Sequence, residues 1–376
     1  NDKKVLNVPA LRFPEFTKEW KKCTIKDYGE VITGNTPPTK NIEYYSNGSY
    51  LWASPADLGL SKHITSTKTK LSLLGLKKTR TIPQGSILVT CIGSTIGKMG
   101  MATETMSTNQ QINSVIVNDS TNNDFAYYAI LNAFPRYLSE VGVQAVPILS
   151  KSNFEKLPNH TTTKEEQRKL GYFLNLLDER IATQNKIIDK LQSLIKGIRN
   201  DVFGKLRKDI GLNAKVGDVL SYEQPQPYIV EDTEYTAGGT PVLTANKAFV
   251  LGYTSETDGI YDKGDCIIFD DFTLDCKYVD FPFKVKSSAI KILTAKNKEL
   301  LRYTFEFLKY LDLSTDEHKR HYIAETQNQE FILPTTQIVR TIAHAFSTLS
   351  SRMQTIVKQR DMLELQKQYL LRQMFI

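Results

Sequence analysis

The chain has 376 residues, of which 40% are hydrophobic and 24% are charged, and its formal net charge is +7. This length suffices for two or three domains with hydrophobic cores, and no run of about 18 apolar residues exists that could span a membrane. The start of the chain, Asn1-Asp2-Lys3, lacks both an initiating Met and the apolar stretch of a secretion signal. We therefore expect a cytoplasmic protein whose numbering begins after processing or trimming.

The four cysteines and five histidines form no pattern typical of a metal site or a disulfide framework. Cys23, Cys91, Cys266 and Cys276 include no CxxC pair, and the histidines do not complete a ligand set. Reduced cysteines of cytoplasmic proteins are usually buried, so we expect buried thiols and no metal.

Residues 1–158 are expected to form a first, mixed α/β domain. Strand-like runs at 86–90 and 114–117 are separated by Gly, Pro and Asn turns, and a helix is expected from Phe125 to Phe134. Residues 1–162 carry 18 basic and 12 acidic side chains, a balance of +6. No acid lies between Asp57 and Glu104, where phosphate contact and a solvated basic face explain the cations equally well. These cations are Lys62, Lys68, Lys70, Lys77, Lys78, Arg80 and Lys98.

Residues 159–204 are expected to form a central coiled-coil helix. From Thr163 to Phe203, apolar residues recur in alternating steps of four and three, which is the spacing of a coiled-coil strand. Thr163 and Glu166 have the spacing of a capping box, and Gln184 interrupts the apolar seam. The predicted seam residues are Leu170, Leu174, Leu177, Ile181, Ile188 and Leu191.

Residues 205–333 are expected to form a second domain on the same plan. Three stretches repeat the first domain: 214–221 resembles 26–33, 239–245 resembles 48–54, and 261–267 resembles 82–88. The loops between these stretches diverge, and residues 204–334 carry 16 basic and 21 acidic side chains, a balance of −5. A shared frame with unrelated loops is typical of two domains that recognise different targets.

Residues 334–376 are expected to form a second coiled-coil helix, because the seam recurs there in the same register, with Ile342 in the place of Leu170 and Met374 in the place of Val202. The chain is therefore an internal, pseudo-two-fold duplication. Two helices with one-sided seams should pair, either with each other as an antiparallel coiled coil or with another chain. Arg360 and Lys367 interrupt this seam, and polar seam residues commonly fix the register. The predicted seam residues are Ile342, Phe346, Leu349, Met353, Ile356 and Leu363.

Five segments complete the pattern of two domains and two helices. They are Pro9-Ala-Leu-Arg-Phe-Pro-Glu-Phe16, Thr33-Gly-Asn-Thr-Pro-Pro-Thr-Lys40, Pro83-Gln-Gly-Ser-Ile-Leu88, Gly93-Ser-Thr-Ile-Gly-Lys98 and Lys164-Glu-Glu-Gln-Arg-Lys169. With this order of domains and helices, the whole chain resembles the specificity subunit of a type I restriction-modification system. The second helix departs from the family pattern, since its start at 334–340 lacks the acidic pair of 165–166.

The resemblance implies a non-catalytic DNA-recognition subunit in the bacterial cytoplasm, associated with the nucleoid and acting in host defence. Each target recognition domain would read one half of a split double-stranded DNA sequence, and the helices would set the gap. Two methyltransferase subunits would dock on this subunit, and endonuclease/translocase subunits would join them. S-adenosylmethionine, ATP and magnesium would be bound by those partners, not by this chain.

Two segments imitate catalytic motifs but lack the required spacing. Gly93–Lys98 has three residues between its glycines where a phosphate-binding loop has four, and Met99 replaces the hydroxyl residue that binds magnesium. The acids Asp270, Asp271 and Asp275, with Lys277, resemble nuclease residues, but they lie too close together in one segment and are expected to be turn residues. We predict no catalytic residue in this chain.

Polar loop residues are the candidates for DNA contact, because amides pair with adenine, Lys and Arg with guanine, and hydroxyls with phosphates. An ordinary turn or capping role is equally compatible with each residue alone. In the first domain the candidates are Asn35, Thr36, Thr39, Lys40, Ser94, Lys98, Asn109, Gln110, Gln111 and Gln144. In the second domain they are Gln224, Gln226, Tyr228, Asn246, Lys247, Lys319, Arg320, His321 and Tyr322.

We therefore predict sequence-specific binding of a bipartite DNA site. A further hypothesis is that Lys284, Lys286 and Lys291, with Lys319–His321, form a basic face on the acidic second domain. Two alternatives stay open at this point: a coiled-coil scaffold whose two globular ends bind proteins, and a nuclease that uses residues 270–277.

Overall fold

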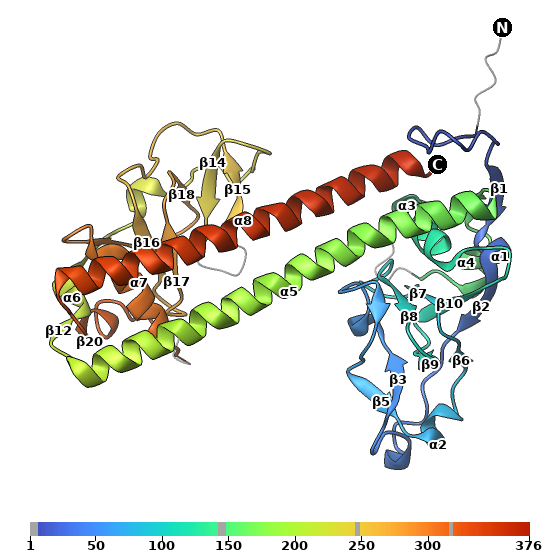
Figure 1. Ribbon diagram of the computed structural model, residues 1–376, viewed down its shortest axis with the longest axis horizontal. Helices are drawn as coiled ribbons and strands as arrows, with labels where there is room; N and C mark the ends of the chain where they lie inside the picture. The colour runs from blue at the N-terminus through green and yellow to red at the C-terminus, as the bar shows by residue number, and fades with distance from the viewer. Residues whose placement is uncertain (1–6, 142–147, 245–248, 316–318) are drawn as a thin grey trace, which may run out of the picture. The chain divides into compact units, whose positions relative to one another are not determined.

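The computed structural model describes residues 7–141, 148–244, 249–315 and 319–376 (Figure 1). It divides into two compact units, of which unit 1 comprises Asn1–Lys186 with Lys358–Ile376 and unit 2 comprises Ile187–Val357. Each unit therefore combines one α/β domain with a part of each long helix. Within the described residues, no helix is both long and apolar enough to cross a membrane.

The described part of unit 1 contains a five-stranded sheet in the order β2-β10-β7-β8-β4, a four-stranded sheet in the order β5-β3-β9-β6, and the pair β1-β11. Its strands are β1 Lys21–Thr24, β2 Gly29–Thr33, β3 Tyr50–Ala53, β4 His63–Ile64, β5 Thr69–Leu71, β6 Thr81–Ile82, β7 Ile87–Thr90, β8 Met99–Ala102, β9 Met106–Thr108, β10 Ile112–Val117 and β11 Pro158–Thr161. Its short helices are α1 Ile25–Tyr28, η1 Ile42–Tyr44, η2 Pro55–Asp57, α2 Leu73–Leu76, α3 Asn123–Val141 and α4 Lys151–Glu155.

Unit 2 repeats this plan with a four-stranded sheet in the order β13-β19-β16-β17, a three-stranded sheet in the order β15-β14-β18, and the pair β12-β20. Its strands are β12 Ala214–Lys215, β13 Leu220–Glu223, β14 Thr240–Leu243, β15 Val250–Thr254, β16 Cys266–Asp270, β17 Cys276–Val279, β18 Lys284–Val285, β19 Ile290–Ala295 and β20 Glu330–Phe331. Its short helices are α6 Val216–Val219, η3 Gln226–Tyr228, α7 Leu300–Leu311 and η4 Thr326–Asn328. The predicted duplication of α/β domains is confirmed by this matching strand order.

A central strand of the largest sheet in each unit is buried on both faces. In β7, Ile87 enters a core with α3 and the long helices, and Leu88 enters a second core between the two sheets. In β16, Phe269 enters one hydrophobic core and Ile268, on the opposite face of the strand, enters another. Because successive side chains of a strand point to opposite faces, a strand buried on both sides needs a continuous apolar run. This explains the apolar run that predicted a strand at 86–90.

The long helices are α5 Lys164–Asp209 and α8 Thr336–Met374, and within each unit they pair antiparallel. In unit 1, Asp178 forms an ion pair with Lys367 at 2.5 Å. In unit 2, the Arg199 guanidinium lies 5.7 Å from the centre of the Phe346 ring. A second contact in unit 1 joins Arg360 Nη1 to Asn185 Oδ1 at 3.1 Å. From the Asp178–Lys367 pair to this contact, the position on α5 advances and the position on α8 retreats by the same number of residues, so the two helices are antiparallel in this unit. The expected antiparallel coiled coil is confirmed.

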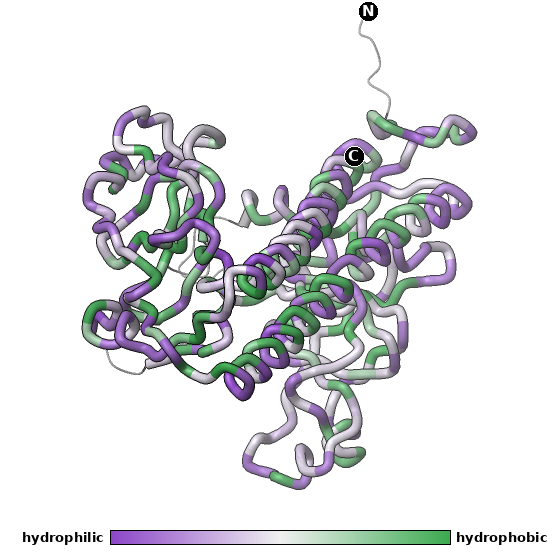
Figure 2. The backbone as a smooth tube through the Cα atoms, turned by 60° about the vertical axis from the view of Figure 1, so that its left-hand side comes forward, coloured by the Kyte–Doolittle hydropathy of each residue, from purple (hydrophilic) through white to green (hydrophobic). Residues whose placement is uncertain are grey.

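The predicted seam residues all lie on the covered side of their helices, either buried or half-buried. Figure 2 shows apolar and polar residues alternating along both long helices, as this one-sided covering requires. The buried seam residues are Leu170, Leu174, Ile188 and Phe346. The half-buried ones are Leu177, Ile181, Leu191, Ile342, Leu349, Met353, Ile356 and Leu363.

The capping box predicted at the start of α5 forms only in part. The Glu166 backbone N–H donates to the Thr163 hydroxyl over 3.4 Å, as expected. The Glu166 carboxylate, however, accepts two hydrogen bonds from Arg12 at 2.7 Å and one from Trp20 Nε1 at 3.2 Å. This side chain ties the start of the helix to the segment before β1 and does not return to the Thr163 backbone.

The letter match between 26–33 and 214–221 is out of register. In the structure, Asp27 Oδ2 accepts from the Thr24 backbone N–H at 2.7 Å, and Asp218 Oδ2 accepts from the Lys215 backbone N–H at 2.8 Å. These equivalent caps align α1 with α6 and Thr24 with Lys215, whereas the letters had aligned Lys26 with Ala214. Chance similarity of Gly and Val letters produced the false register.

Candidate nucleic-acid interface

Loops of unit 1 that are distant in the sequence meet at one edge of its sheets. The Thr36 hydroxyl donates to the Gln110 side-chain oxygen at 2.5 Å, which joins the loop after β2 to the loop before β10. The Gln111 amide donates to the Ile92 carbonyl oxygen at 3.4 Å, which adds the loop after β7. The structure therefore brings together three loops whose polar residues were predicted as candidates.

A fourth loop joins them through Asn35. Its amide donates to the Lys78 carbonyl oxygen at 2.9 Å and accepts from the Arg80 backbone N–H at 2.8 Å. Gly34 makes the close packing possible, because a Cβ there would lie 2.3 Å from the Thr108 carbonyl oxygen. The Asn35 side chain holds the loops together, so it is not available for a bidentate pair with a base.

The candidate residues of the first domain differ in exposure. Asn109 is buried, and its amide donates to Gln111 Oε1 at 3.1 Å while its oxygen accepts from the Gln111 N–H at 2.9 Å. This side chain also shapes its loop. Thr36 and Gln111 are half-buried, and Gln144 lies outside the described residues. The exposed candidates are Thr39, Lys40, Ser94, Lys98 and Gln110.

The turn Gly93–Lys98 connects β7 with β8 and is held by two glycines. Gly93 and Gly97 have φ values of 97° and 91°, which residues with a Cβ adopt only with strain. A Cβ on Gly97 would also lie 2.8 Å from the Phe134 ring. A phosphate-binding loop leads from a strand into a helix, whereas this turn joins two antiparallel strands and presents Ser94 and Lys98 to solvent.

The basic stretch between residues 57 and 104 is a surface feature with one exception. Lys68, Lys70, Lys77, Lys78, Arg80 and Lys98 are exposed. Lys62 is buried and pairs with Asp124 at 2.6 Å, so it does not belong to the surface predicted from the charge pattern.

In unit 2, the candidates divide into exposed and core residues. His321 and Tyr322 are both 1% exposed, and their backbone N–H groups donate to the Asp271 carboxylate at 3.1 and 2.8 Å. Tyr228 is also buried, and its hydroxyl donates to Glu223 at 2.6 Å. These three side chains stabilise the domain and are not presented at its surface. Gln224, Gln226, Lys319 and Arg320 are exposed, and Asn246 and Lys247 lie outside the described residues.

Two of the lysines expected to form a basic face on the second domain are buried and do not reach its surface. Lys284 is 3% exposed and pairs with Glu256 at 2.5 Å. Lys291 is 1% exposed and pairs with Asp271 at 3.6 Å. The sequence showed the positive charges of these lysines but not the acids that neutralise them, so this part of the hypothesis is wrong.

The acids of residues 270–275 serve separate structural roles. Asp270 accepts from the Phe272 N–H at 2.9 Å and from the Thr273 hydroxyl at 2.7 Å, which closes a turn. Burial opposes ionisation of Asp275, but hydrogen bonds from Lys309 and Lys277 outweigh it and hold the pKa of this carboxyl below its usual value. Among the described residues, no group of three or more His, Cys, Asp or Glu side chains is arranged to hold a metal.

The cysteines are free thiols in apolar surroundings. Burial raises the pKa of Cys91, Cys266 and Cys276 to about 12, and that of the half-buried Cys23 to about 11. Because the thiolate is the reactive form, these values indicate unreactive side chains.

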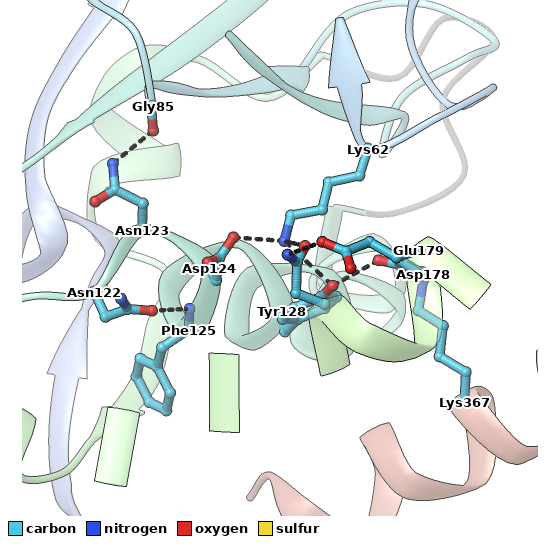
Figure 3. Close-up of polar contacts among 11 residues, drawn as sticks. Lys62, Gly85, Asn122, Asn123, Asp124, Phe125, Tyr128, Asp178, Glu179 and Lys367 are labelled. Atoms are coloured by element: carbon cyan, nitrogen blue, oxygen red, sulfur yellow. Dashed lines mark hydrogen bonds and ion pairs between the residues drawn. The ribbon is translucent and has the colours of Figure 1, made fainter. Parts of the chain in front are cut away.

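A polar network around the buried side chains of Lys62 and Tyr128 in unit 1 was not predicted from the sequence (Figure 3). Lys62 Nζ donates to Asp124 Oδ1 at 2.6 Å and to Asn175 Oδ1 at 3.0 Å. The Tyr128 hydroxyl donates to Asp178 at 2.6 Å, and Asp178 also pairs with Lys367. The only signal in the sequence was the lysine at seam position 367, since residue types alone do not show that Lys62 is buried.

Residues 17–193 match the family model described as the type I restriction modification DNA specificity domain. These residues, somewhat less than half of the chain, are therefore similar to the members of that family. The match covers the first α/β domain and a large part of α5, and it includes the four loops that meet in unit 1. The resemblance noted from the sequence is thereby confirmed.

Three curated specificity subunits are similar to parts of the chain. The EcoR124I/EcoR124II subunit of Escherichia coli is 45% identical over 126 residues, which are 32% of this chain and 31% of that protein. The MjaIX subunit of Methanocaldococcus jannaschii is 30% identical over 183 residues, 46% of this chain and 42% of that protein. The HindI subunit of Haemophilus influenzae is 30% identical over 186 residues, 47% of this chain and 40% of that protein. The matches therefore span less than half the length of each relative.

Two solved structures resemble the fold along nearly the whole chain. A type I restriction-modification S subunit from M. genitalium has a TM-score of 0.68 at 16% identity, and the likeness covers 98% of this chain and 99% of that one. A chain from a study of complex assembly and conformational transition of a type I restriction-modification system has a TM-score of 0.52 at 13% identity, with 94% and 96% covered. At these identities, the likeness shows the fold alone.

Two of the segments that indicated the specificity family contact each other. Besides the pair between Arg12 and Glu166, Lys169 pairs with Glu15, and the Phe13 and Phe173 rings meet edge to face at 5.9 Å. The segment 9–16 therefore packs on the start of α5. At the equivalent place in α8, Ile338 stands where α5 has Glu166, so α8 lacks the carboxylate that makes this contact in α5.

Proposed function

We propose that this chain is the sequence-specific DNA-binding subunit of a type I restriction-modification complex, with each α/β domain reading one half of a bipartite target. The main support is one edge of unit 1, where four loops within the matched family domain meet. Beside them lies the exposed basic stretch between Asp57 and Glu104, which contains no acid. Cations on such a surface bind phosphates without regard to sequence, and the polar loop residues between them supply sequence preference.

In the first domain, Lys40 and Lys98 are the proposed phosphate or guanine contacts, and Gln110 and Ser94 are the proposed polar contacts. All four are exposed on the loops that meet in unit 1. The exposed Lys68, Lys70, Lys77, Lys78 and Arg80 add to the positive field of this domain.

In the second domain, we propose contact through Gln224, Gln226, Lys319 and Arg320. Burial of Lys284 and Lys291 against acids leaves fewer cations for phosphates. We therefore propose that the first domain provides most of the nonspecific affinity and that the second domain mainly contributes selectivity.

The helices are proposed to set the gap between half-sites and to dock two methyltransferase subunits. Large apolar side chains stay exposed on both helices in unit 1, namely Tyr172, Leu176, Met362, Leu365 and Tyr369. Exposed apolar residues of this size favour a protein partner. S-adenosylmethionine, ATP and magnesium are proposed to be bound by the methyltransferase and endonuclease/translocase partners, in the bacterial cytoplasm and close to the nucleoid.

The test is a genome-wide map of methylated bases in cells that express this chain with its methyltransferase partner. Cells without this chain but with the active partner are the control. We expect a split motif, with two fixed half-sites and a fixed gap, that disappears without the chain. An unchanged methylation pattern would contradict the proposal and favour the protein-scaffold alternative. DNA cleavage by the purified chain alone with magnesium would favour the nuclease alternative.

A further inference from the structure

The polar network around Lys62 lies in unit 1, where the first α/β domain meets both long helices (Figure 3). Lys62 precedes β4, Asp124 and Tyr128 belong to α3, Asn175 and Asp178 belong to α5, and Lys367 belongs to α8. The Lys62 side chain is 4% exposed, and its ammonium lies 4.3 Å from the centre of the Tyr128 ring. A single connected set of hydrogen bonds therefore spans four segments of the unit.

The segment that carries Lys62 is also attached to the strand that follows the Gly93–Lys98 turn. The Met101 N–H donates to the Lys62 carbonyl oxygen at 2.6 Å, and the Gly59 N–H donates to the Met99 carbonyl oxygen at 3.1 Å. A Cβ on Gly59 would lie 3.2 Å from the Lys98 side chain. The position of the proposed DNA-contact turn is thus connected to the helices through short backbone hydrogen bonds to the segment that carries Lys62.

A charge network around a buried cation constrains geometry more narrowly than apolar packing does. Apolar side chains tolerate small shifts, because dispersion and the hydrophobic effect are not directional. Hydrogen bonds weaken steeply when their angles change, and a buried cation without acceptors is strongly unfavourable. A rotation of the first domain on the helices would separate Lys62 from Asn175 and Tyr128 from Asp178, so the network selects one orientation.

Unit 2 has a polar junction at the equivalent place, with different residues. Glu306 of α7 pairs with Arg199 of α5 at 2.7 Å and with Arg302 at 2.6 Å, and Arg302 also donates to Ser350 of α8. In the helix duplication that matches Leu177 with Leu349, Ser350 is the counterpart of Asp178. Asp178 of α5 and Ser350 of α8, which are equivalent in the duplication, therefore each take part in attaching an α/β domain to the helices.

On the basis of the proposed function, we propose that the Lys62–Asp124–Tyr128–Asp178–Lys367 network is a positioning device for gap recognition. It holds the first domain and its Gly93–Lys98 turn at one angle to the helices, so that the two half-sites are bound together only at one separation. The network residues act through the domain they orient and do not contact DNA.

The test measures binding of the full chain to duplexes that carry both mapped half-sites at the native gap, one base pair shorter and one base pair longer. Lys62→Met removes the buried cation at similar length, and Tyr128→Phe removes only a hydroxyl. Residues in one network are commonly coupled by energies worth roughly 2- to 150-fold in an equilibrium constant. We expect the preference for the native gap to fall about tenfold in Lys62→Met and less in Tyr128→Phe. The matched control is Lys151→Met, which removes an exposed lysine paired at 3.7 Å with Glu155 in the same unit, and it should keep the wild-type preference.

A double variant separates orientation from stability. Lys62→Met with Asp124→Leu replaces the ion pair by apolar side chains, which often restores stability while directional contacts stay lost. A thermal midpoint near that of the wild type together with a flattened gap preference would support the positioning role. A gap preference as sharp as wild type in Lys62→Met and in the double variant would overturn it, whatever their stability. If the wild-type chain itself does not prefer its mapped duplex over a scrambled one, the proposed function fails, and the positioning role fails with it.

Discussion

The first and second α/β domains have the same strand order but differ in the exposure and pairing of their basic side chains. In the first domain, Lys40 and Lys98 stand exposed on loops, and the nearby basic stretch lacks acids. In the second domain, Lys284 and Lys291 are buried against Glu256 and Asp271. Buried apolar residues therefore fix the strand order that both domains share, whereas the surroundings of the basic side chains differ from one domain to the other.

Equivalent aromatic residues pack into the domain core near the C-terminal end of each long helix. Phe203 packs against Tyr303 and Phe307 with ring centres 5.3 and 5.5 Å away, and Phe375 packs against Trp20 and Phe125 at 5.9 and 5.5 Å. If the two aromatic side chains are equivalent in packing, Phe203→Ala and Phe375→Ala should each lower the free energy of unfolding by about 3 to 5 kcal/mol.

Urea unfolding measures this prediction. Both tryptophans, Trp20 and Trp52, lie in unit 1, so tryptophan fluorescence follows Phe375→Ala, and circular dichroism follows Phe203→Ala. A loss below about 1 kcal/mol in either variant would show that the two ends are not equivalent in packing.

The second prediction concerns the salt dependence of DNA affinity. Each phosphate contact contributes about −0.9 to the slope of log affinity against log salt concentration. Lys40→Ala with Lys98→Ala should therefore flatten the slope by up to about 1.8, and Lys319→Ala with Arg320→Ala should flatten it less, since Lys319 already pairs with Glu325 at 3.0 Å. Fluorescence anisotropy titrations between low and moderate salt provide the slopes. If the salt slope changed as much or more in Lys319→Ala with Arg320→Ala, the first domain would not provide most of the phosphate contacts.

The third prediction uses the glycines that precede β7 and β16. Gly85 and Gly264 have φ values of 82° and 90°, so alanine is strained by about 1 to 2 kcal/mol at either position. A Cβ on Gly85 would also lie 2.7 Å from Asn123 Nδ2, whereas a Cβ on Gly264 meets no neighbouring atom within 4 Å. Gly85→Ala should therefore lower the thermal midpoint clearly more than Gly264→Ala. Equal shifts would mean that Asn123 moves aside without loss.

The smallest expected effect is a pH dependence confined to unit 1. Burial, and then the nearby Arg136 and Lys22, hold the pKa of His160 below its usual 6.5. Because the unfolded chain takes up the proton first, the contribution of His160 to stability is complete above about pH 6.5 and decreases as the pH falls below it. His160→Gln should remove a small part of the acid destabilisation seen in urea midpoints between pH 7 and pH 5. An identical pH dependence in the wild type and the variant would contradict this assignment.

The sequence allowed the frame to be predicted because its signals are periodic. The heptad seam defined α5 and α8 and their duplication, and the apolar run at 86–90 defined β7. The match of Gly85 with Gly264 was also correct, since both glycines adopt a positive φ before a strand. Where letters matched without such a constraint, as between 26–33 and 214–221, the register was wrong.

The site could be predicted only in outline, because residue type does not reveal burial or long-range partners. Asn35 and Asn109 are used to build loops, His321 and Tyr322 lie in a core, and Lys62 pairs with Asp124 far along the chain. In the sequence, the first four were candidates for DNA contact and Lys62 belonged to the basic stretch. The polar seam position Lys367 was the one visible sign of the junction network.

The central claim is that each α/β domain reads a different half of one split DNA target. It is tested most directly by mapping methylated bases in cells that carry either Ser94→Ala with Gln110→Ala or Gln224→Ala with Gln226→Ala, together with the methyltransferase partner. We predict that the first pair relaxes the sequence of one half-site, that the second pair relaxes the other, and that the gap is unchanged in both. Relaxation of the same half-site by both pairs, or of neither half-site by either pair, would contradict the claim.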